Sequence, residues 1–111
     1  MNYNGKDVLV VGAGRSGLAA ARLLLTSGAR VILTDTKHRN SLETALAPLL
    51  EIARNSGKLE LELGAHRPES FGNCDFVVVS PGVPLSLPEF ERSRESGIPI
   101  IAEVELAYRH L

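Results

Sequence analysis

The spacing of three glycines, Gly12, Gly14 and Gly17, constrains the fold of this chain more than any other feature. They form the pattern G-x-G-x-x-G, which follows an apolar run at residues 8–11 and precedes a helical pattern at residues 15–27. Gly12 permits a tight strand-to-helix turn, Gly14 lets a ligand approach the backbone, and Gly17 lets the helix pack on the strand. The pattern therefore predicts a βα unit whose helix N-terminus, with its unpaired N–H groups, anchors a nucleotide.

A carboxylate stands at a distance that suits such a site. Asp35 lies 18 residues after Gly17, just past a second apolar strand expected at residues 31–33. In dinucleotide-binding units an acidic residue about 20 residues after the glycines bonds the ribose hydroxyls. This spacing favours a nucleotide site but does not distinguish a dinucleotide from another nucleotide. The alternative is that the glycines only build a βα turn.

Composition narrows the class of protein. The 111 residues suit one small domain, and a net charge of −1 gives no basic field for nucleic acid or a membrane surface. Four apolar residues before a glycine are too few for a signal peptide or membrane span, so we expect a cytoplasmic protein. The single Cys74 excludes an internal disulfide, and His38, His66 and His110 are too scattered to suggest a metal site.

Apolar runs alternate with helical patterns along the whole chain. Strands are expected at residues 8–11, 31–33, 59–63, 76–79 and 98–101. This alternation predicts an α/β fold, a Rossmann-like open five-stranded parallel sheet with flanking helices, in the order 3-2-1-4-5. The ligand crevice is then expected where the order reverses, between the loops that carry Gly14 and Gly82.

The connection after the second strand predicts a helix from Asn40 to Gly57. Asn40 and Glu43 resemble a capping box, and Pro48 predicts either a kink or two short helices that meet near Ala47. Leucines then alternate with glutamates at residues 59–63, which predicts an edge strand with its glutamates in water. The third connection looks too short for a full crossover helix.

Two more helices are expected near the C-terminus. Ser86 and Glu89 resemble a second capping box, with Pro88 in the first turn of a helix that stops at Gly97. The final helix is expected at residues 103–111. Its apolar stripe would consist of Val104, Ala107 and Leu111, with Leu106 beside it.

A second loop lies at the expected crevice. Residues 80–84 are Ser-Pro-Gly-Val-Pro and follow the buried strand at residues 76–79. The prolines stiffen the loop and lower the entropy lost on ordering, while Gly82 can offer its N–H to an anion and Ser80 supplies a hydroxyl. The alternative is a rigid turn between a strand and a helix.

Four segments cover nearly the whole chain in order: VLVVGAGRSGLAAARLL, VILTD, VVVSPGVP and GIPIIAEVELAYR. Together they resemble the N-terminal domain of the Mur ligases, and most of all the branch that adds D-glutamate. The resemblance implies that residues 1–111 are a single N-terminal domain excised from a longer multidomain ligase. It also implies a ligand, the UDP part of UDP-N-acetylmuramoyl-L-alanine, and two partners, the central and C-terminal domains.

The resemblance also assigns the site. Arg15 and Ser16 would lie against the uracil, with the Ser16 N–H on a base oxygen, and Asp35 would accept from the uracil ring N–H. The Gly82 N–H would donate to the diphosphate. Arg15 stands where the family often has an apolar residue, and Ala102 where it usually has glycine. The expected UDP-binding residues are Gly14, Arg15, Ser16, Asp35, Thr36, Lys37, Ser80, Pro81 and Gly82.

By resemblance the parent ligase uses ATP and Mg²⁺ to activate a carboxylate as an acyl phosphate. This chain has no G-x-x-x-x-G-K-[ST] loop, because Gly57-Lys58 is followed by Leu59. We therefore expect no catalytic residue, metal ligand or cofactor in this domain. Two other interpretations stay open: an NAD-binding domain of a dehydrogenase or an NAD-sensing regulator, in which Asp35 holds ribose, and an assembly module with a vestigial crevice.

Overall fold

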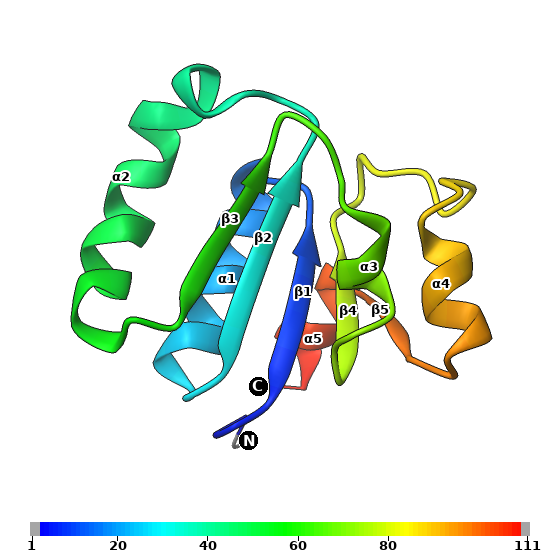
Figure 1. Cartoon of the computed structure of the whole chain (residues 1–111). Coiled ribbons are helices and arrows are strands. Elements are labelled where there is room, and N and C mark those ends of the chain that lie inside the picture. The colour runs from blue at the N-terminus through cyan, green and yellow to red at the C-terminus, as the bar shows by residue number, and fades with distance from the viewer. Residues whose placement is uncertain (1–2, 110–111) are drawn as a thin grey trace.

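The computed structural model describes residues 3–109 and has an α/β architecture built on one sheet (Figure 1). All five strands are parallel, and their order is β3-β2-β1-β4-β5. Both the fold class and the strand order predicted from the sequence are confirmed. The strands are β1 (Asp7–Val11), β2 (Arg30–Asp35), β3 (Leu59–Leu63), β4 (Phe76–Val79) and β5 (Ile100–Ala102). The helices are α1 (Arg15–Thr26), α2 (Arg39–Ser56), α3 (Pro68–Phe71), α4 (Phe90–Glu95) and α5 (Glu103–Tyr108).

The central strand β1 sets the position of the loops. It pairs with β2 through Val11 and Thr34 and with β4 through Val11 and Val79, so three chain segments leave the sheet side by side. Residues 8–11 and 76–79 are buried throughout, as expected for parallel strands that are covered on both faces. The loops after β1, β2 and β4 therefore meet at the carboxyl ends of the strands, which form one edge of the sheet.

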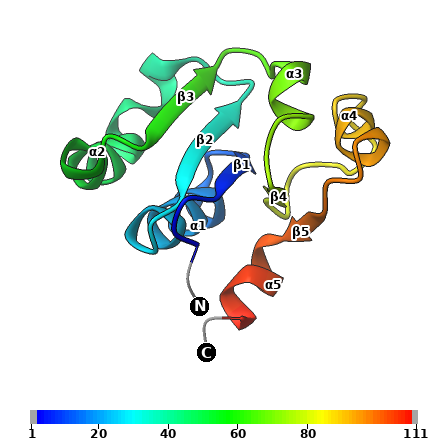
Figure 2. The same ribbon diagram turned by 60° about the horizontal axis from the view of Figure 1, so that its bottom comes forward.

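The helices form a layer on each face of the sheet (Figure 2). Helices α1, α2 and α5 cover the face to which Val8, Val10 and Leu33 point, and Leu24, Leu46 and Leu106 fill that core. Helices α3 and α4 cover the face to which Leu9 and Val11 point. They do so with Phe71 and Phe90, whose rings meet edge to face at 5.4 Å.

Helix α2 differs from the sequence prediction in two ways. It is one continuous helix from residue 39 to 56, so the expectation of two pieces meeting near Ala47 is wrong. Pro48 has no N–H to donate to the Thr44 carbonyl, but both residues are exposed, so water can replace this hydrogen bond. The capping box is also wrong, because His38 is the N-cap residue and Asn40 lies inside the helix. Gly57 ends α2, as predicted, and the structure shows it in the left-handed conformation.

Strand β3 lies at the sheet edge as predicted, but one of its glutamates does not face water. The Glu62 side chain is 5% exposed, and both its oxygens accept the Ser70 hydroxyl, at 2.7 and 2.8 Å. Arg67 approaches the same carboxylate at 3.7 Å. The short helix α3 covers this glutamate, and a period-two pattern alone does not reveal such a cover.

The C-terminal third differs most from the prediction. Helix α4 begins at Phe90, so Ser86 does not cap it, and residues 84–90 form successive turns instead. In α5 only Leu106 is buried, whereas Val104 is 69% exposed, so the predicted stripe is wrong for Val104 and Ala107. Leu111, the third member of that stripe, lies outside the described residues. No helix within residues 3–109 is both long and apolar enough to cross a membrane.

Candidate functional site

The glycine loop between β1 and α1 is held against β2 and β4. Gly12 has a φ of +104°, which favours glycine, and its N–H donates to the Thr34 carbonyl at 2.8 Å. A Cβ on Gly17 would overlap the carbonyl oxygen of Gly12. These two glycines are therefore required by the fold itself.

Asp35 connects this loop to the end of β2. One carboxylate oxygen accepts the Ala13 N–H at 2.7 Å, and the other accepts the Lys37 N–H at 2.8 Å. A carboxylate oxygen has two lone pairs, so each oxygen can still accept one further hydrogen bond. Asp35 thus fixes two turns of the chain and keeps acceptor capacity at the sheet edge.

The N-terminus of α1 is open. Gly14 is its N-cap residue, no side chain caps it, and the first helical bond runs from the Leu18 N–H to the Gly14 carbonyl at 2.9 Å. The N–H groups of Arg15, Ser16 and Gly17 precede that bond and have no intrahelical acceptor. Together with the helix dipole they favour an anion or a polar ligand oxygen.

A groove of about 610 Å³ runs from this N-terminus along the space between α1 and α2. Its wall is mostly apolar, with Leu18, Leu49 and Ile52 among its residues. Arg15, Arg22 and Lys37 also line it, and no acidic side chain does. Arg22 was missed in the sequence analysis, although it lies seven residues, two helical turns, after Arg15 and therefore on the same face.

The loop after β4 packs against the glycine loop from the other side. The Ser80 side chain is buried, and its hydroxyl donates to the Gly12 carbonyl at 3.4 Å. The Val83 N–H closes a turn on the Ser80 carbonyl at 3.0 Å, which leaves Pro81 and Gly82 exposed at its tip. In this arrangement the Ser80 hydroxyl supports the loop, whereas the tip is free to meet a ligand.

Gly14 and Gly82 differ from the structural glycines. A Cβ on either residue would meet no atom of the chain within 4 Å, and neither has a positive φ. Neither packing nor backbone conformation within the described residues requires glycine there. The remaining physical reason for glycine at these two positions is space for a ligand close to the backbone.

The structure gathers most of the predicted residues at one edge but does not give them equal roles. Gly14, Arg15 and Lys37 line the α1–α2 groove, with Asp35 bonded to Ala13 at its mouth. Ser16 is half-buried and Thr36 is exposed, and neither lines the groove. Pro81 and Gly82 lie on the other side of the glycine loop.

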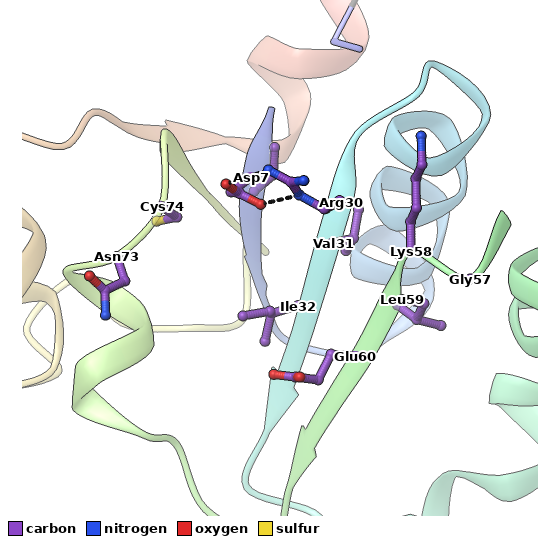
Figure 3. A pocket seen from close by; sticks show the side chains of 11 residues that line it. Asp7, Arg30, Val31, Ile32, Gly57, Lys58, Leu59, Glu60, Asn73 and Cys74 are labelled. Atoms are coloured by element: carbon purple, nitrogen blue, oxygen red, sulfur yellow. Dashed lines mark hydrogen bonds and ion pairs between the residues drawn. The ribbon is translucent and has the colours of Figure 1, made fainter. Parts of the chain in front are cut away.

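A second hollow, of about 310 Å³, lies at the opposite edge, where the strands begin (Figure 3). Its charged residues are of both signs: Asp7 and Glu60, Arg30 and Lys58. Asp7 and Arg30 pair at 2.6 Å, and this hydrogen bond holds the pKa of Asp7 below its ordinary value. With balanced charges and no glycine loop, this hollow has no feature that selects a nucleotide.

A comparison with protein families identifies the group to which the chain is related. The model of the Mur ligase MurD-like N-terminal domain matches residues 6–102. The chain belongs to this family. The resemblance seen in the four sequence segments is thereby confirmed for this MurD-like domain.

Curated relatives agree with that assignment. The MurD-like domain is 45% identical to the UDP-N-acetylmuramoylalanine–D-glutamate ligase of Acidobacterium capsulatum over 111 residues, which are 100% of the chain and 23% of the relative. It is 46% identical to the ligase of that name from Desulfosudis oleivorans over 104 residues, which are 94% of the chain and 22% of the relative. The chain thus spans less than a quarter of the length of these relatives.

Solved structures support the fold. A pseudomurein peptide ligase type C from Methanothermus fervidus superposes with a TM-score of 0.69 at 19% identity, over 92% of this chain and 20% of that one. The precorrin-2 dehydrogenase SirC superposes with a TM-score of 0.53 at 18% identity, over 88% of this chain and 42% of that one. At these identities the likeness concerns the fold of the MurD-like domain alone.

Proposed function

We propose that this MurD-like domain binds the UDP part of UDP-N-acetylmuramoyl-L-alanine and serves a ligase that joins D-glutamate to it. The observation that carries the proposal is the convergence of three elements at one sheet edge: the open N-terminus of α1, the Asp35 turn and the tip of the loop at residues 80–83. Family membership and the names of the relatives support the choice of ligand. The ligase activity and the cytoplasmic location are parts of the same proposal.

Uracil fits the mouth of the α1–α2 groove by its hydrogen-bonding pattern. It presents one ring N–H between two carbonyl oxygens, which calls for one acceptor and neighbouring donors. Asp35 has acceptor capacity left, and the N–H groups at residues 15–17 are donors at the start of α1, the helix that follows the Ala13 N–H bonded to Asp35. Arg15 and Lys37 at the groove mouth supply an apolar stem and a positive charge on either side.

In this proposal the diphosphate lies at the open N-terminus of α1, with the exposed Gly82 as its second contact. The α1 N-terminus favours negative charge, and the absence of a Cβ at Gly14 and Gly82 allows close approach to the backbone. The loop tip that carries Pro81 is stiff, so ordering it around a ligand costs little entropy.

ATP and Mg²⁺, which the family implies, do not fit this domain. Within residues 3–109 no three carboxylate, imidazole or thiol groups converge as a metal site, and the sequence lacks a phosphate-binding lysine loop. We therefore assign ATP binding to the other domains of the parent ligase. The 111-residue chain alone is expected to hydrolyse no ATP, and turnover above a blank in a phosphate-release assay would contradict this assignment.

Calorimetric titration of the chain with UDP-N-acetylmuramoyl-L-alanine, UDP and NAD tests the proposal. The uridine ligands are expected to bind more tightly than NAD, and weakly in absolute terms, because the other domains contribute no contacts. NAD binding as tight as UDP binding would favour the dehydrogenase interpretation, in which Asp35 bonds ribose. Absence of binding by all three would favour an assembly module.

A further inference from the structure

The turn after β3 contacts the segment that carries Asp35 and Lys37. The Gly64 N–H donates to the Asp35 carbonyl at 3.0 Å and to the Lys37 carbonyl at 2.9 Å. One donor is thus shared by two carbonyls that lie on either side of Thr36. Since Asp35 also accepts the Lys37 N–H through its side chain, the turn at residues 35–37 is closed from both sides.

Gly64 also makes room for the next side chain along this segment. Its φ is +92°, and a Cβ there would lie 2.9 Å from Nδ1 of His38 and 3.0 Å from Cε1. The His38 ring therefore rests directly on the Gly64 backbone. His38 is the N-cap residue of α2, so this contact fixes the point where the turn becomes helix.

A third contact lies one residue before Asp35. Thr34 Oγ1 is 2.8 Å from Nδ1 of His66, and the His66 ring meets Phe71 edge to face at 5.8 Å. Thr34 is buried, and Phe71 belongs to the core under α3 and α4. His66 thus connects the end of β2 to a rigid part of the molecule.

These contacts matter because residues 36–38 are exposed and cannot be held in place by burial in the core. Hydrogen bonds fix the backbone of this turn instead, through the Gly64 N–H on the Asp35 and Lys37 carbonyls and the Lys37 N–H on the Asp35 carboxylate. His66 holds the preceding residue, Thr34, through its side chain. A displaced turn would move the Asp35 carboxylate away from the Ala13 N–H and the Lys37 side chain away from the groove mouth.

We propose that Gly64 and His66 are positioning residues of the nucleotide site, which act through Asp35 and Lys37 without touching the ligand. This inference rests on the function proposed above. It extends the site from the three loops at the crevice to the turn after the edge strand β3, where the sequence analysis expected no ligand-binding residue.

The variant Gly64→Ala tests the proposal, and Gly57→Ala is its matched control. Both glycines have positive φ, +92° and +65°, so alanine is strained at either position. A Cβ on Gly57 meets nothing within 4 Å, and this residue lies at the far edge of the sheet. The control therefore reproduces the backbone strain without disturbing the Asp35 turn.

Three measurements are made on each variant: the melting temperature, the dissociation constant for UDP, and the ¹H–¹⁵N chemical shifts of the Ala13 and Lys37 amides. For Gly64→Ala we expect at least fivefold weaker UDP binding and displaced amide signals of both residues. Gly57→Ala should bind UDP within twofold of the unchanged chain and keep both signals. Equal UDP affinities of the two variants, or unmoved amide signals in Gly64→Ala, would overturn the proposal.

A second variant keeps the test decisive if Gly64→Ala does not fold. His66→Leu removes the bond to Thr34 and keeps an apolar contact with Phe71, and it is expected to bind UDP about threefold more weakly with a shifted Lys37 amide. An unchanged affinity and an unchanged amide would contradict the role of His66. The amide signals report on the turn without ligand, so the inference is testable even if the unchanged chain fails to bind UDP, which would contradict the proposed function instead.

Discussion

The Asp35 carboxylate accepts the Ala13 N–H at 2.7 Å and so joins the end of β2 to the glycine loop after β1. Replacement by asparagine keeps the shape of the side chain but removes its negative charge. A hydrogen bond to a charged acceptor is roughly twice as strong as one to a neutral acceptor, so both bonds become weaker. The NH₂ group of asparagine would also face either the Ala13 N–H or the Lys37 N–H, and two donors cannot bond each other. We expect Asp35→Asn to lower the free energy of unfolding by about 1–3 kcal/mol, measured by urea denaturation.

The same variant shows which part of the nucleotide Asp35 contacts. Cytosine lacks the ring N–H of uracil, so the unchanged chain should bind CDP more weakly than UDP. Asp35→Asn should then weaken UDP binding by on the order of 1–3 kcal/mol and CDP binding much less. Equal losses for both nucleotides in calorimetric titrations would show that Asp35 bonds ribose.

The glycines of the site are expected to separate into two kinds. Gly14→Ala and Gly82→Ala create no contact within the chain, so each should change the free energy of unfolding by less than about 1 kcal/mol. UDP binding by both variants should fall at least tenfold, because the added methyl group occupies ligand space. Gly17→Ala is the contrasting control, since its Cβ meets the Gly12 carbonyl, and it should lose about 1–3 kcal/mol of stability. Full UDP affinity in Gly14→Ala and Gly82→Ala would contradict a ligand role for these two glycines.

The buried Glu62 depends on one hydroxyl. Ser70→Ala removes the donor that both carboxylate oxygens share. Of the Glu62 side-chain contacts described above, only the one with Arg67, at 3.7 Å, then remains. We expect a loss of about 1–3 kcal/mol in urea denaturation, the cost of an unsatisfied buried acceptor. Ser86→Ala, at an exposed position that caps no helix, should stay within about 0.5 kcal/mol, and an equal effect of the two variants would refute this account.

Cys74 should react slowly with alkylating agents. Burial raises the pKa of its thiol to about 11, so at pH 8 its thiolate fraction is about a hundredfold below that of a free thiol. The rate of reaction with iodoacetamide should continue to rise with pH up to about 11, whereas that of N-acetylcysteine levels off earlier. A rate at pH 8 within tenfold of that of N-acetylcysteine would contradict the raised pKa of this partly buried thiol.

Much of the fold could be predicted from the sequence because short apolar runs alternate with helical patterns along the chain. Those runs gave the strands in order, and the reversal beside β1 placed the loops of Gly14 and Gly82 at one edge. The helix starts were less predictable. Asn40-x-x-Glu43 and Ser86-x-x-Glu89 both match the capping-box sequence, but the sequence caps a helix only where the backbone changes from extended to helical at its first residue. His38 begins α2 instead, because Gly64 closes the preceding turn.

Contacts between distant segments account for the remaining differences. The Asp35–Ala13 bond follows from the pairing of Val11 with Thr34, and the Gly64 contact follows from the pairing of Asp35 with Leu63. Neither register can be deduced from periodicity alone. Glu62 is buried because a four-residue helix carries Ser70 over it, and Val104 is exposed because α5 reaches the core through Leu106.

The central claim is that a uridine nucleotide binds at the carboxyl edge of the sheet, and ¹H–¹⁵N NMR of the chain titrated with UDP tests it most directly. The account predicts that the largest shift changes fall on the amides of Ala13, Ser16, Asp35, Lys37 and Gly82, and that NAD produces weaker changes at equal concentration. Shift changes centred instead on Asp7, Arg30 and Cys74 at the opposite edge, or NAD effects equal to those of UDP, would contradict it.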